Sequence, residues 1–277
     1  MTPDPEAVAG AVARALDEDA GPGDVTTNAI VANEGAGIAV LEVRQDCTVA
    51  GTDVARAVFS HLEPRGFRFP GECADGDRLK EGDRVPFAIG PLRALLTGER
   101  VALNFLQRLS GIATLTRRFV EAAPGVQVRD TRKTTPGLRA LERHAVAAGG
   151  GVNHRFGLFD AVLIKDNHIA AAGSLTEAVR RVRAAGATPV QVECDSLDLV
   201  REAMAAGVEA ILLDNMDPAT IARAVSIVDC AAFVEASGGI TLATVGAIAA
   251  TGVDAVSVGA LTHSAPAIDL SFDIRPE

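Results

Sequence analysis

Short apolar runs alternate with amphipathic helical patterns along the second half of the chain, from Val126 onward. Runs of this kind, with few polar residues among the apolar ones, indicate parallel strands that are buried on both faces. Gly residues end several of the helical patterns, and Ser174, Ser196, Asp217 and Thr241 stand where N-caps are expected. The pattern predicts a repeated array of strand and helix, with strands in VQVRD, AVLIKD, PVQVECD, EAILLDN, AAFVEAS and VDAVSVG.

The length of this array limits the architecture. A complete eight-stranded (β/α) barrel needs about 250 residues, whereas the array begins at Val126 and ends near Ala265. We therefore expect an α/β fold whose second part is an incomplete (β/α) barrel of six or seven strands. An open doubly wound sheet is the alternative, but no glycine-rich fingerprint follows the first predicted strand, as a dinucleotide-binding fold would require.

The first part of the chain has a different pattern. A helical segment is followed by extended runs, GIAVLEVR and VPFAIG, with DGD and EGD turns between them. We expect residues 1–108 to form an N-terminal α/β sandwich domain and residues 109–268 to form the barrel. A long helical stretch, ERVALNFLQRLSGIATLTRRFVEAA, connects the two parts. Residues 269–277, which contain all but the first residue of the extended run IDLSFDI, are expected to return to the first domain.

Composition narrows the possible partners. The 277 residues are 48% hydrophobic, which is enough for a sizeable core, and the formal charge of −10 argues against nucleic acid or an anionic membrane surface as a partner. The start of the sequence, MTPDPEAVAG, lacks the features of a signal peptide, and the apolar runs are too short to cross a bilayer. We expect a cytoplasmic protein. Its four scattered cysteines are expected to be reduced thiols, without zinc.

Polar residues or glycines follow each predicted strand, in DTRK, KDNH, ECDS, LDNM, EASGG and SVGALTHS. In (β/α) barrels the active site is built at the carboxyl ends of the strands, while the strand interiors carry packing residues. The sequence therefore places its chemistry at one end of the predicted barrel.

Basic side chains gather in one part of this acidic chain. Residues 130–168 hold six of the 26 Lys and Arg residues and three of the five His, against four acids. Arg132, Lys133 and Lys165 come at strand ends, where Arg supplies a planar fork for carboxylates and Lys a compact charge. This arrangement predicts a cationic site for a small, multiply anionic substrate.

Other cations in the same segment divide into two groups. Arg139 and Arg143 lie inside a predicted helix and are expected at its solvated face. The run AGGGVNHR is interpreted as a flexible loop that brings His154 and Arg155 into the site, because no GxSxG motif accompanies it to suggest a hydrolase.

Two carboxylates and several glycines complete the candidate site. Glu193 and Asp214 end consecutive strands and could hold Mg²⁺, bind ribose hydroxyls, stabilise a cationic anomeric carbon, or only balance nearby cations. Glycine-rich loops after late barrel strands commonly bind phosphate through backbone N–H groups at a helix start. The candidate phosphate-binding residues are Ser237, Gly238, Gly239, Val258, Gly259, Ala260 and His263.

Taken together, these motifs resemble the quinolinate phosphoribosyltransferase family, also called carboxylating nicotinate-nucleotide pyrophosphorylases. The resemblance covers nearly the whole chain. It rests on GDVTT, GERVALNFLQRLSGIAT, DTRKTTPGLR, GGGVNHR, LIKDNHI, VECDS, LLDNM, EASGGI and SVGALTHS. The family fold, that of a type II phosphoribosyltransferase, joins a small α/β sandwich to an incomplete barrel, in agreement with the strand count.

The resemblance implies a reaction of quinolinate with phosphoribosyl pyrophosphate that gives nicotinate mononucleotide, pyrophosphate and carbon dioxide, as part of NAD biosynthesis. It implies no organic cofactor. Quinolinate is a dianion, and the resemblance assigns it to Arg132, Arg155 and Lys165, with Thr131 and His154 beside them.

The resemblance also assigns residues to the phosphoribosyl donor. Lys133 would contact the donor, Glu193 and Asp214 its ribose and Mg²⁺, and the candidate phosphate-binding residues its 5′-phosphate. The position of Arg100 reaches into a neighbouring subunit's site in the family, which implies a homodimer or a hexamer with shared active sites.

Three other functions compete with this one. A relative with the same fold could use nicotinate, or another anionic heteroaromatic, without decarboxylation. Lys165 could form the Schiff base of an aldolase-type barrel. A non-catalytic phosphosugar-binding protein could use the same residues for affinity alone.

Overall fold

A computed structural model describes residues 3–32 and 34–277 of the chain, so the first two residues of the predicted N-terminal domain lie outside the described part. The chain divides into two compact units. Unit 1 takes in the described residues up to Arg117 with 134–150 and 261–277, and unit 2 comprises 118–133 and 151–260. The domain boundary that the sequence places at residue 108 stays a prediction.

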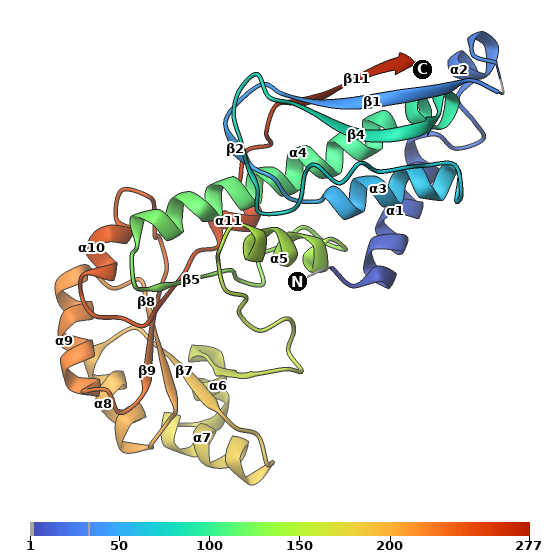
Figure 1. Ribbon diagram of the computed structural model, residues 1–277. Coiled ribbons are helices and arrows are strands. Elements are labelled where there is room, and N and C mark those ends of the chain that lie inside the picture. Colours follow the sequence, from blue (N-terminus) through green and yellow to red (C-terminus); the bar gives the residue numbers. More distant parts are fainter. Residues whose placement is uncertain (1–2, 33) are drawn as a thin grey trace. The chain divides into compact units, whose positions relative to one another are not determined.

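Unit 1 is built on a three-stranded antiparallel sheet in the order β11-β1-β4 (Figure 1). Burial alternates along β1, so that every second residue faces the core. Phe59 of α3 packs against Phe87 and Phe272 of the sheet, with ring centroids 6.4 and 6.0 Å apart. The elements named here are β1 (Ala36–Val43), α3 (Thr52–Leu62), β4 (Arg84–Pro91) and β11 (Leu270–Pro276).

Further helices and short strands accompany this sheet, and α4 runs on from unit 1 into the first residues of unit 2. They are α1 (Pro5–Asp19), α2 (Val25–Ile30), β2 (Cys47–Thr48), β3 (Arg78–Leu79), α4 (Leu92–Ala122) and α5 (Arg139–Ala148). Inside α4, a Cβ on Gly111 would lie 2.0 Å from the carbonyl oxygen of Pro266, so only glycine allows this close approach. No helix in the described part of the chain is long and apolar enough to cross a membrane.

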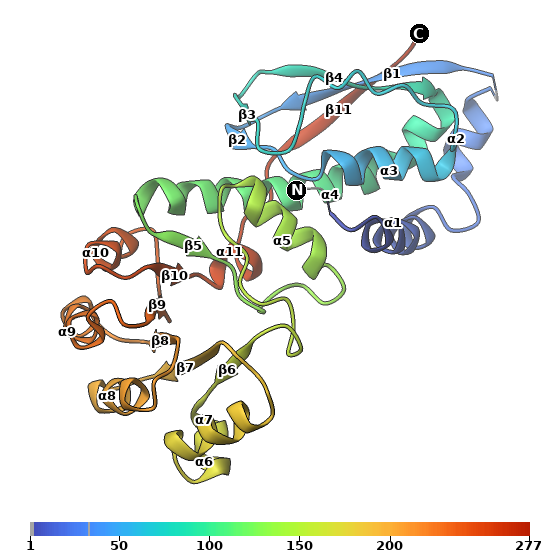
Figure 2. The same ribbon diagram turned by 60° about the horizontal axis from the view of Figure 1, so that its bottom comes forward.

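Unit 2 is a six-stranded parallel sheet in the order β5-β10-β9-β8-β7-β6. Figure 2 shows its strands in an arc with α7 to α10 on the outer side. The strands are β5 (Gln127–Arg129), β6 (Val162–Ile164), β7 (Val190–Cys194), β8 (Ala210–Asp214), β9 (Phe233–Ser237) and β10 (Ala255–Ser257). The helices are α6 (Asp166–Ala172), α7 (Leu175–Ala184), α8 (Leu197–Ala205), α9 (Pro218–Val228), α10 (Val245–Ala249) and α11 (Ala260–His263), the last of which continues into unit 1.

The strand order confirms the incomplete barrel. Each strand from β7 to β10 pairs with the strand before it in the chain, and β5 pairs with β10, so β5 and β6 form the two ends of the sheet. A doubly wound sheet would instead reverse its strand order at a switch point and carry helices on both faces. All six strands lie in the predicted runs. The barrel is open between β5 and β6.

Three of the four predicted N-caps are confirmed. The side chains of Ser174, Ser196 and Asp217 each accept a hydrogen bond from a backbone N–H in the first turn of α7, α8 and α9. The prediction for Thr241 is wrong, because α10 begins later and its N-cap is Thr244. Thr241 lies in the turn before this helix, where its backbone N–H donates to the Thr244 hydroxyl.

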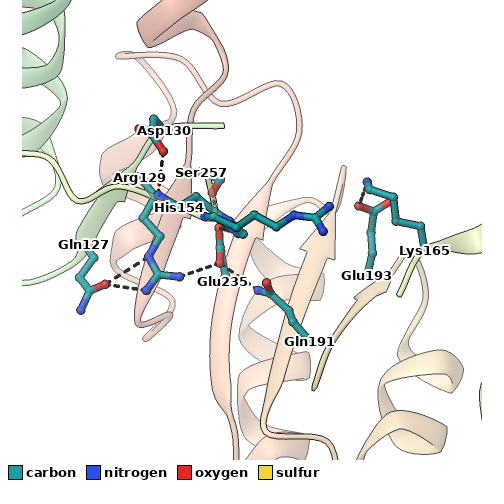
Figure 3. Close-up of polar contacts among 10 residues, drawn as sticks. Gln127, Arg129, Asp130, His154, Lys165, Gln191, Glu193, Glu235 and Ser257 are labelled. Atoms are coloured by element: carbon teal, nitrogen blue, oxygen red, sulfur yellow. Dashed lines mark hydrogen bonds and ion pairs between the residues drawn. The ribbon is translucent and has the colours of Figure 1, made fainter. Parts of the chain in front are cut away.

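A fully buried carboxylate ties four strands of unit 2 together (Figure 3). Glu235 of β9 accepts hydrogen bonds from Arg129 Nη1 of β5 at 3.0 Å and from Gln191 Nε2 of β7 at 2.9 Å. The hydroxyl of Ser257, on β10, donates to the other carboxylate oxygen. The guanidinium of Arg129 also lies over the Phe233 ring, 4.6 Å from its centroid. Glu235 and its three donors therefore connect β5, β7, β9 and β10 inside the open barrel.

The partners of Glu235 keep it ionised. Burial opposes the charged form and by itself raises the pKa, but hydrogen bonds from His154, Ser257 and Gln191 outweigh it and hold the pKa of Glu235 below its ordinary value. Because the ordinary value is 4.5, the carboxylate carries a full negative charge at neutral pH.

We predict that Glu235 makes the fold sensitive to acid. Its folded-state pKa lies below the unfolded value, so its contribution to the free energy of unfolding is complete above about pH 4.5 and is lost as the pH falls through the lower, folded-state pKa. Urea unfolding at a series of pH values across this range measures the loss.

The comparison of two variants isolates this contribution. Glu235→Gln should be less stable than the wild type at neutral pH and should lose this part of the pH dependence. Glu177→Gln is the matched control, since hydrogen bonds from Arg180 and Arg181 lower the pKa of Glu177 as well, to about 2, but at the surface, where solvent weakens ion pairs. Equal pH dependence in Glu235→Gln and the wild type contradicts the prediction.

Candidate active site

A cavity of about 430 Å³ opens at the carboxyl ends of the unit 2 strands. Eleven of the predicted site residues line it, and they come from the ends of five strands and from the loop between α5 and β6. They are Thr131, Arg132, Lys133, His154, Arg155, Lys165, Glu193, Asp214, Ser237, Gly238 and Gly239. The placement follows from the parallel sheet, which brings every strand end to the same edge.

One side of the cavity is cationic. Arg132 and Lys133 follow β5, and Arg155 comes from the loop that precedes β6. Burial and then repulsion from the Arg132 charge lower the pKa of Arg155, although a guanidinium stays protonated at any ordinary pH. Two guanidinium groups that repel each other in a partly buried cavity favour the binding of an anion between them.

The loop that carries His154 and Arg155 is fixed by hydrogen bonds. Asp130, at the end of β5, is fully buried and accepts hydrogen bonds from the His154 backbone N–H and the Asn153 side chain, both at 2.7 Å. The Arg155 backbone N–H donates to His154 Nδ1 at 2.7 Å, and Arg155 Nη1 donates to the Ala161 carbonyl at 3.2 Å. The predicted loop is present, with specific contacts on both sides of Arg155.

Two carboxylates line the same cavity. Lys165, the residue after β6, forms an ion pair with Glu193 of β7, and Figure 3 shows the two side chains pointing toward each other. Asp214, at the end of β8, accepts a hydrogen bond from the Asn215 side chain at 2.8 Å. The Lys165 ammonium is thus paired with an acid, whereas a Schiff-base lysine must react as a neutral amine.

Asn215 explains the glycine that follows β9. Asn215 has a left-handed backbone with φ of 55°, and its N–H donates to the Ser237 carbonyl at 2.9 Å. A Cβ on Gly238 would lie 2.2 Å from Asn215 Oδ1, and the φ of 91° at Gly238 also favours glycine. The turn after β9 therefore approaches the turn after β8 closely, which narrows the cavity at this edge.

The phosphate-binding prediction is partly corrected by local geometry. Ser237, Gly238 and Gly239 line the cavity, but no helix begins there, because α10 starts only at Val245. The N–H of Val258 donates to the Arg129 carbonyl at 2.9 Å, and its predicted contact with a phosphate stays a prediction.

The other predicted residues lie elsewhere. Gly259 and Ala260 do not belong to the cavity lining, and neither does Arg100, an exposed residue of α4. His263 is in unit 1, where its Nδ1 lies 2.6 Å from the Ser264 hydroxyl.

Sequence reasoning missed several lining or supporting residues. Leu163, Leu212, Asn215 and Ser257 also line the cavity, and Glu235 lies beneath it. Asn215 stands directly after Asp214 in LLDNM, so its position was a usable signal. Glu235 and Ser257 fall inside strand runs, where apolar packing residues are expected.

The donor set gives limited information about a metal. Glu193 and Asp214 offer the hard oxygen atoms that Mg²⁺ prefers, and both face the same cavity. Among residues 3–32 and 34–277, no group of three or more His, Cys, Asp or Glu side chains is placed to hold a metal ion. Two carboxylates suit an ion that brings further oxygen ligands with it, such as Mg²⁺ bound to a diphosphate.

Comparisons with known proteins agree over both units. The family descriptions "Quinolinate phosphoribosyl transferase, N-terminal domain" and "C-terminal domain" match residues 24–110 and 112–273. A Bacillus subtilis protein named probable nicotinate-nucleotide pyrophosphorylase [carboxylating] is 43% identical over 261 residues, which cover 93% of this chain and 90% of the relative. The nicotinate-nucleotide pyrophosphorylase [carboxylating] of Mycobacterium leprae is 44% identical over 271 residues and 95% of each chain.

A solved structure extends the agreement to the fold. NadC from Streptococcus pyogenes superimposes with a TM-score of 0.95 at 42% sequence identity, over 100% of this chain and 99% of that one. Both the sequence match and the structural match span the two units. The chain therefore belongs to the quinolinate phosphoribosyltransferase family.

Proposed function

We propose that this chain transfers the phosphoribosyl group of phosphoribosyl pyrophosphate to quinolinate, with loss of carbon dioxide, and so forms nicotinate mononucleotide and pyrophosphate. The observation that carries the proposal is a single cavity lined by guanidinium groups, two lysines and two carboxylates. Anionic substrates need the cations, and a sugar that develops positive charge needs the carboxylates. Membership of the family supplies the same reaction.

Quinolinate binds at the cationic side. Its two carboxylates accept paired hydrogen bonds from the guanidinium groups of Arg132 and Arg155, which match carboxylate geometry. Lys165 adds a third positive charge across the cavity, and Thr131 and His154 lie alongside. A monocarboxylate such as nicotinate would leave one of these cations without its anionic partner.

The phosphoribosyl donor binds beside quinolinate in the same cavity. Lys133 contacts its pyrophosphate, Glu193 and Asp214 bind the ribose hydroxyls, and the turn that starts at Ser237 receives the 5′-phosphate. For Gly259, Ala260 and His263 a phosphate contact stays a prediction.

When bound to the donor's pyrophosphate, Mg²⁺ would neutralise part of the charge of the leaving group. Glu193 and Asp214 are the side chains in the cavity that would approach this ion. Because Lys165 already pairs with Glu193, binding of the ion would compete with this ion pair.

The reaction then proceeds in two steps. The pyridine nitrogen attacks the anomeric carbon while the bond to pyrophosphate breaks, and the Glu193 and Asp214 carboxylates stabilise the positive charge that develops on the sugar. The positively charged ring then loses its 2-carboxylate as carbon dioxide, and the electron pair left at C2 takes a proton from water. Arg132, Arg155 and Lys165 hold the ring in line for the first step, which is mainly a matter of position.

The active assembly is proposed to be a dimer, or a hexamer built from dimers, in which Arg100 completes the site of a second copy. Arg100 is exposed on α4 and does not line the cavity of its own chain. In unit 2, Leu158 and Phe159 expose 73% and 83% of their surface, next to the loop that carries Arg155. Exposed large apolar side chains of this kind are typical of surfaces that a partner covers.

The reaction is tested by the release of carbon dioxide. We predict release from quinolinate that depends on both phosphoribosyl pyrophosphate and Mg²⁺, and a kcat/KM for quinolinate at least roughly tenfold higher than for nicotinate, since nicotinate lacks one charge-assisted contact. Equal or better use of nicotinate contradicts the assignment. Absence of any turnover favours a non-catalytic binding protein.

The shared site is tested by mixing two inactive variants. Lys165→Ala and Arg100→Ala should each be inactive, and random exchange of subunits in a symmetric dimer restores one native site in each mixed dimer, or about a quarter of all sites. Mixing Lys165→Ala with Arg132→Ala is the control and should restore nothing, because both residues line the cavity of their own chain. If differently tagged subunits exchange and no activity returns in the first mixture, Arg100 does not act across the interface.

A further inference from the structure

The imidazole of His154 has a protein group against each of its two nitrogens. The backbone N–H of Arg155 donates to Nδ1 at 2.7 Å. On the other side of the ring, Nε2 lies 3.4 Å from Oε1 of Glu235. Only 12% of the His154 side chain is exposed, and the backbone N–H of the same residue is bound to Asp130. Both ring nitrogens and the backbone N–H of His154 therefore have a contact within the protein.

These contacts locate the proton of the ring. A ring nitrogen that accepts a hydrogen bond carries no proton, so the bond from Arg155 requires an unprotonated Nδ1. The proton of the neutral ring then lies on Nε2, where it faces the Glu235 carboxylate. A second proton, on Nδ1, would set two N–H donors against each other at 2.7 Å. The geometry favours a neutral imidazole that is protonated at Nε2.

Glu235 is rigidly placed for this contact. Its Oε2 accepts hydrogen bonds from Arg129 and Gln191, and its Oε1 accepts one from Ser257 on the same side as His154. The three donors belong to three strands, so the carboxylate has a fixed orientation relative to the barrel interior (Figure 3). Every group around it is a donor, which favours a carboxylate over an amide at this position.

We propose that Glu235 is a positioning residue for the active site, which accepts the Nε2 proton of His154 and thereby keeps Nδ1 as the acceptor for the Arg155 backbone. In this way a buried carboxylate holds the segment from which the Arg155 guanidinium enters the cavity. His154 then adds no positive charge to the site, and recognition of the anion falls to Arg132, Arg155 and Lys165. The consequence for quinolinate rests on the proposed function, whereas the state of the ring does not.

The state of the ring is measured by nitrogen-15 NMR of the histidine side chains, in the wild-type chain without substrate at neutral pH. The chain has five histidines, and the His154→Gln variant identifies the signal to assign. We expect the shift pattern of a neutral ring with its proton on Nε2. A proton on Nδ1, or on both nitrogens, overturns the proposal, whatever reaction the chain catalyses.

Two variants separate positioning from general stability. Glu235→Gln places an NH₂ group among donors, so we expect His154 to lose its single protonation pattern and the KM for quinolinate to rise roughly tenfold. The KM for phosphoribosyl pyrophosphate should change by less than about threefold, because the effect is confined to the Arg155 side of the cavity. Gln191→Met is the matched control, since Gln191 donates to Oε2 of the same carboxylate while His154 faces Oε1.

The control should lower the thermal stability and leave both the His154 pattern and the KM for quinolinate close to those of the wild type. A merely structural carboxylate would make the two variants alike in KM, and this result overturns the proposal, as does an unchanged ring in Glu235→Gln. If Glu235→Gln does not fold, the nitrogen-15 spectrum of His154 in the wild-type chain is the test of the proposal. A chain with no quinolinate turnover but the expected ring state would refute the proposed function and leave the positioning contact intact.

Discussion

Burying a carboxylate without partners costs several kcal/mol, and breaking a buried pair leaves the same cost behind. Glu235 is fully buried inside the six-stranded sheet, so unit 2 is stable only in an arrangement that supplies donors to both of its oxygens. Those donors come from β5, β7 and β10, which are distant in sequence and meet only when the strands are in register. The hydrogen bonds of the ionised Glu235 carboxylate therefore depend on the strand order of the sheet, and they support residues at the active-site cavity.

The acidic and the basic side chains of the cavity have different electrostatic surroundings. The acidic side chains of the cavity have polar partners, as Glu193 pairs with Lys165 and Asp214 accepts a hydrogen bond from Asn215. The positive charges of Arg132 and Arg155 repel each other. A chain with a formal charge of −10 thus presents positive charge where the strands end. An anion that enters this cavity replaces repulsion by attraction, which is the physical basis for binding a dianionic substrate.

Much of this organisation could be predicted from the sequence, because strand and helix periodicity is local. The six strands and the incomplete barrel follow from apolar runs and chain length, and the predicted residues at the ends of five of the six strands line the cavity. The sequence failed where long-range partners decide the outcome. Glu235 meets Arg129 across 106 positions, and no local pattern marks that pair. The predicted N-cap at Thr241 is wrong for a more local reason, because Thr244, three residues later, is the N-cap of the short helix α10.

The central claim is that paired cations at the strand ends select an anion with two carboxylates. The most direct test is calorimetric binding of quinolinate and nicotinate, without donor, to the wild type, to Arg155→Ala and to Arg201→Ala, whose arginine pairs with Asp198 at the surface. We predict that the wild type and Arg201→Ala bind quinolinate at least roughly tenfold more tightly than nicotinate, and that Arg155→Ala loses most of this preference. A preference that survives unchanged in Arg155→Ala would contradict the account.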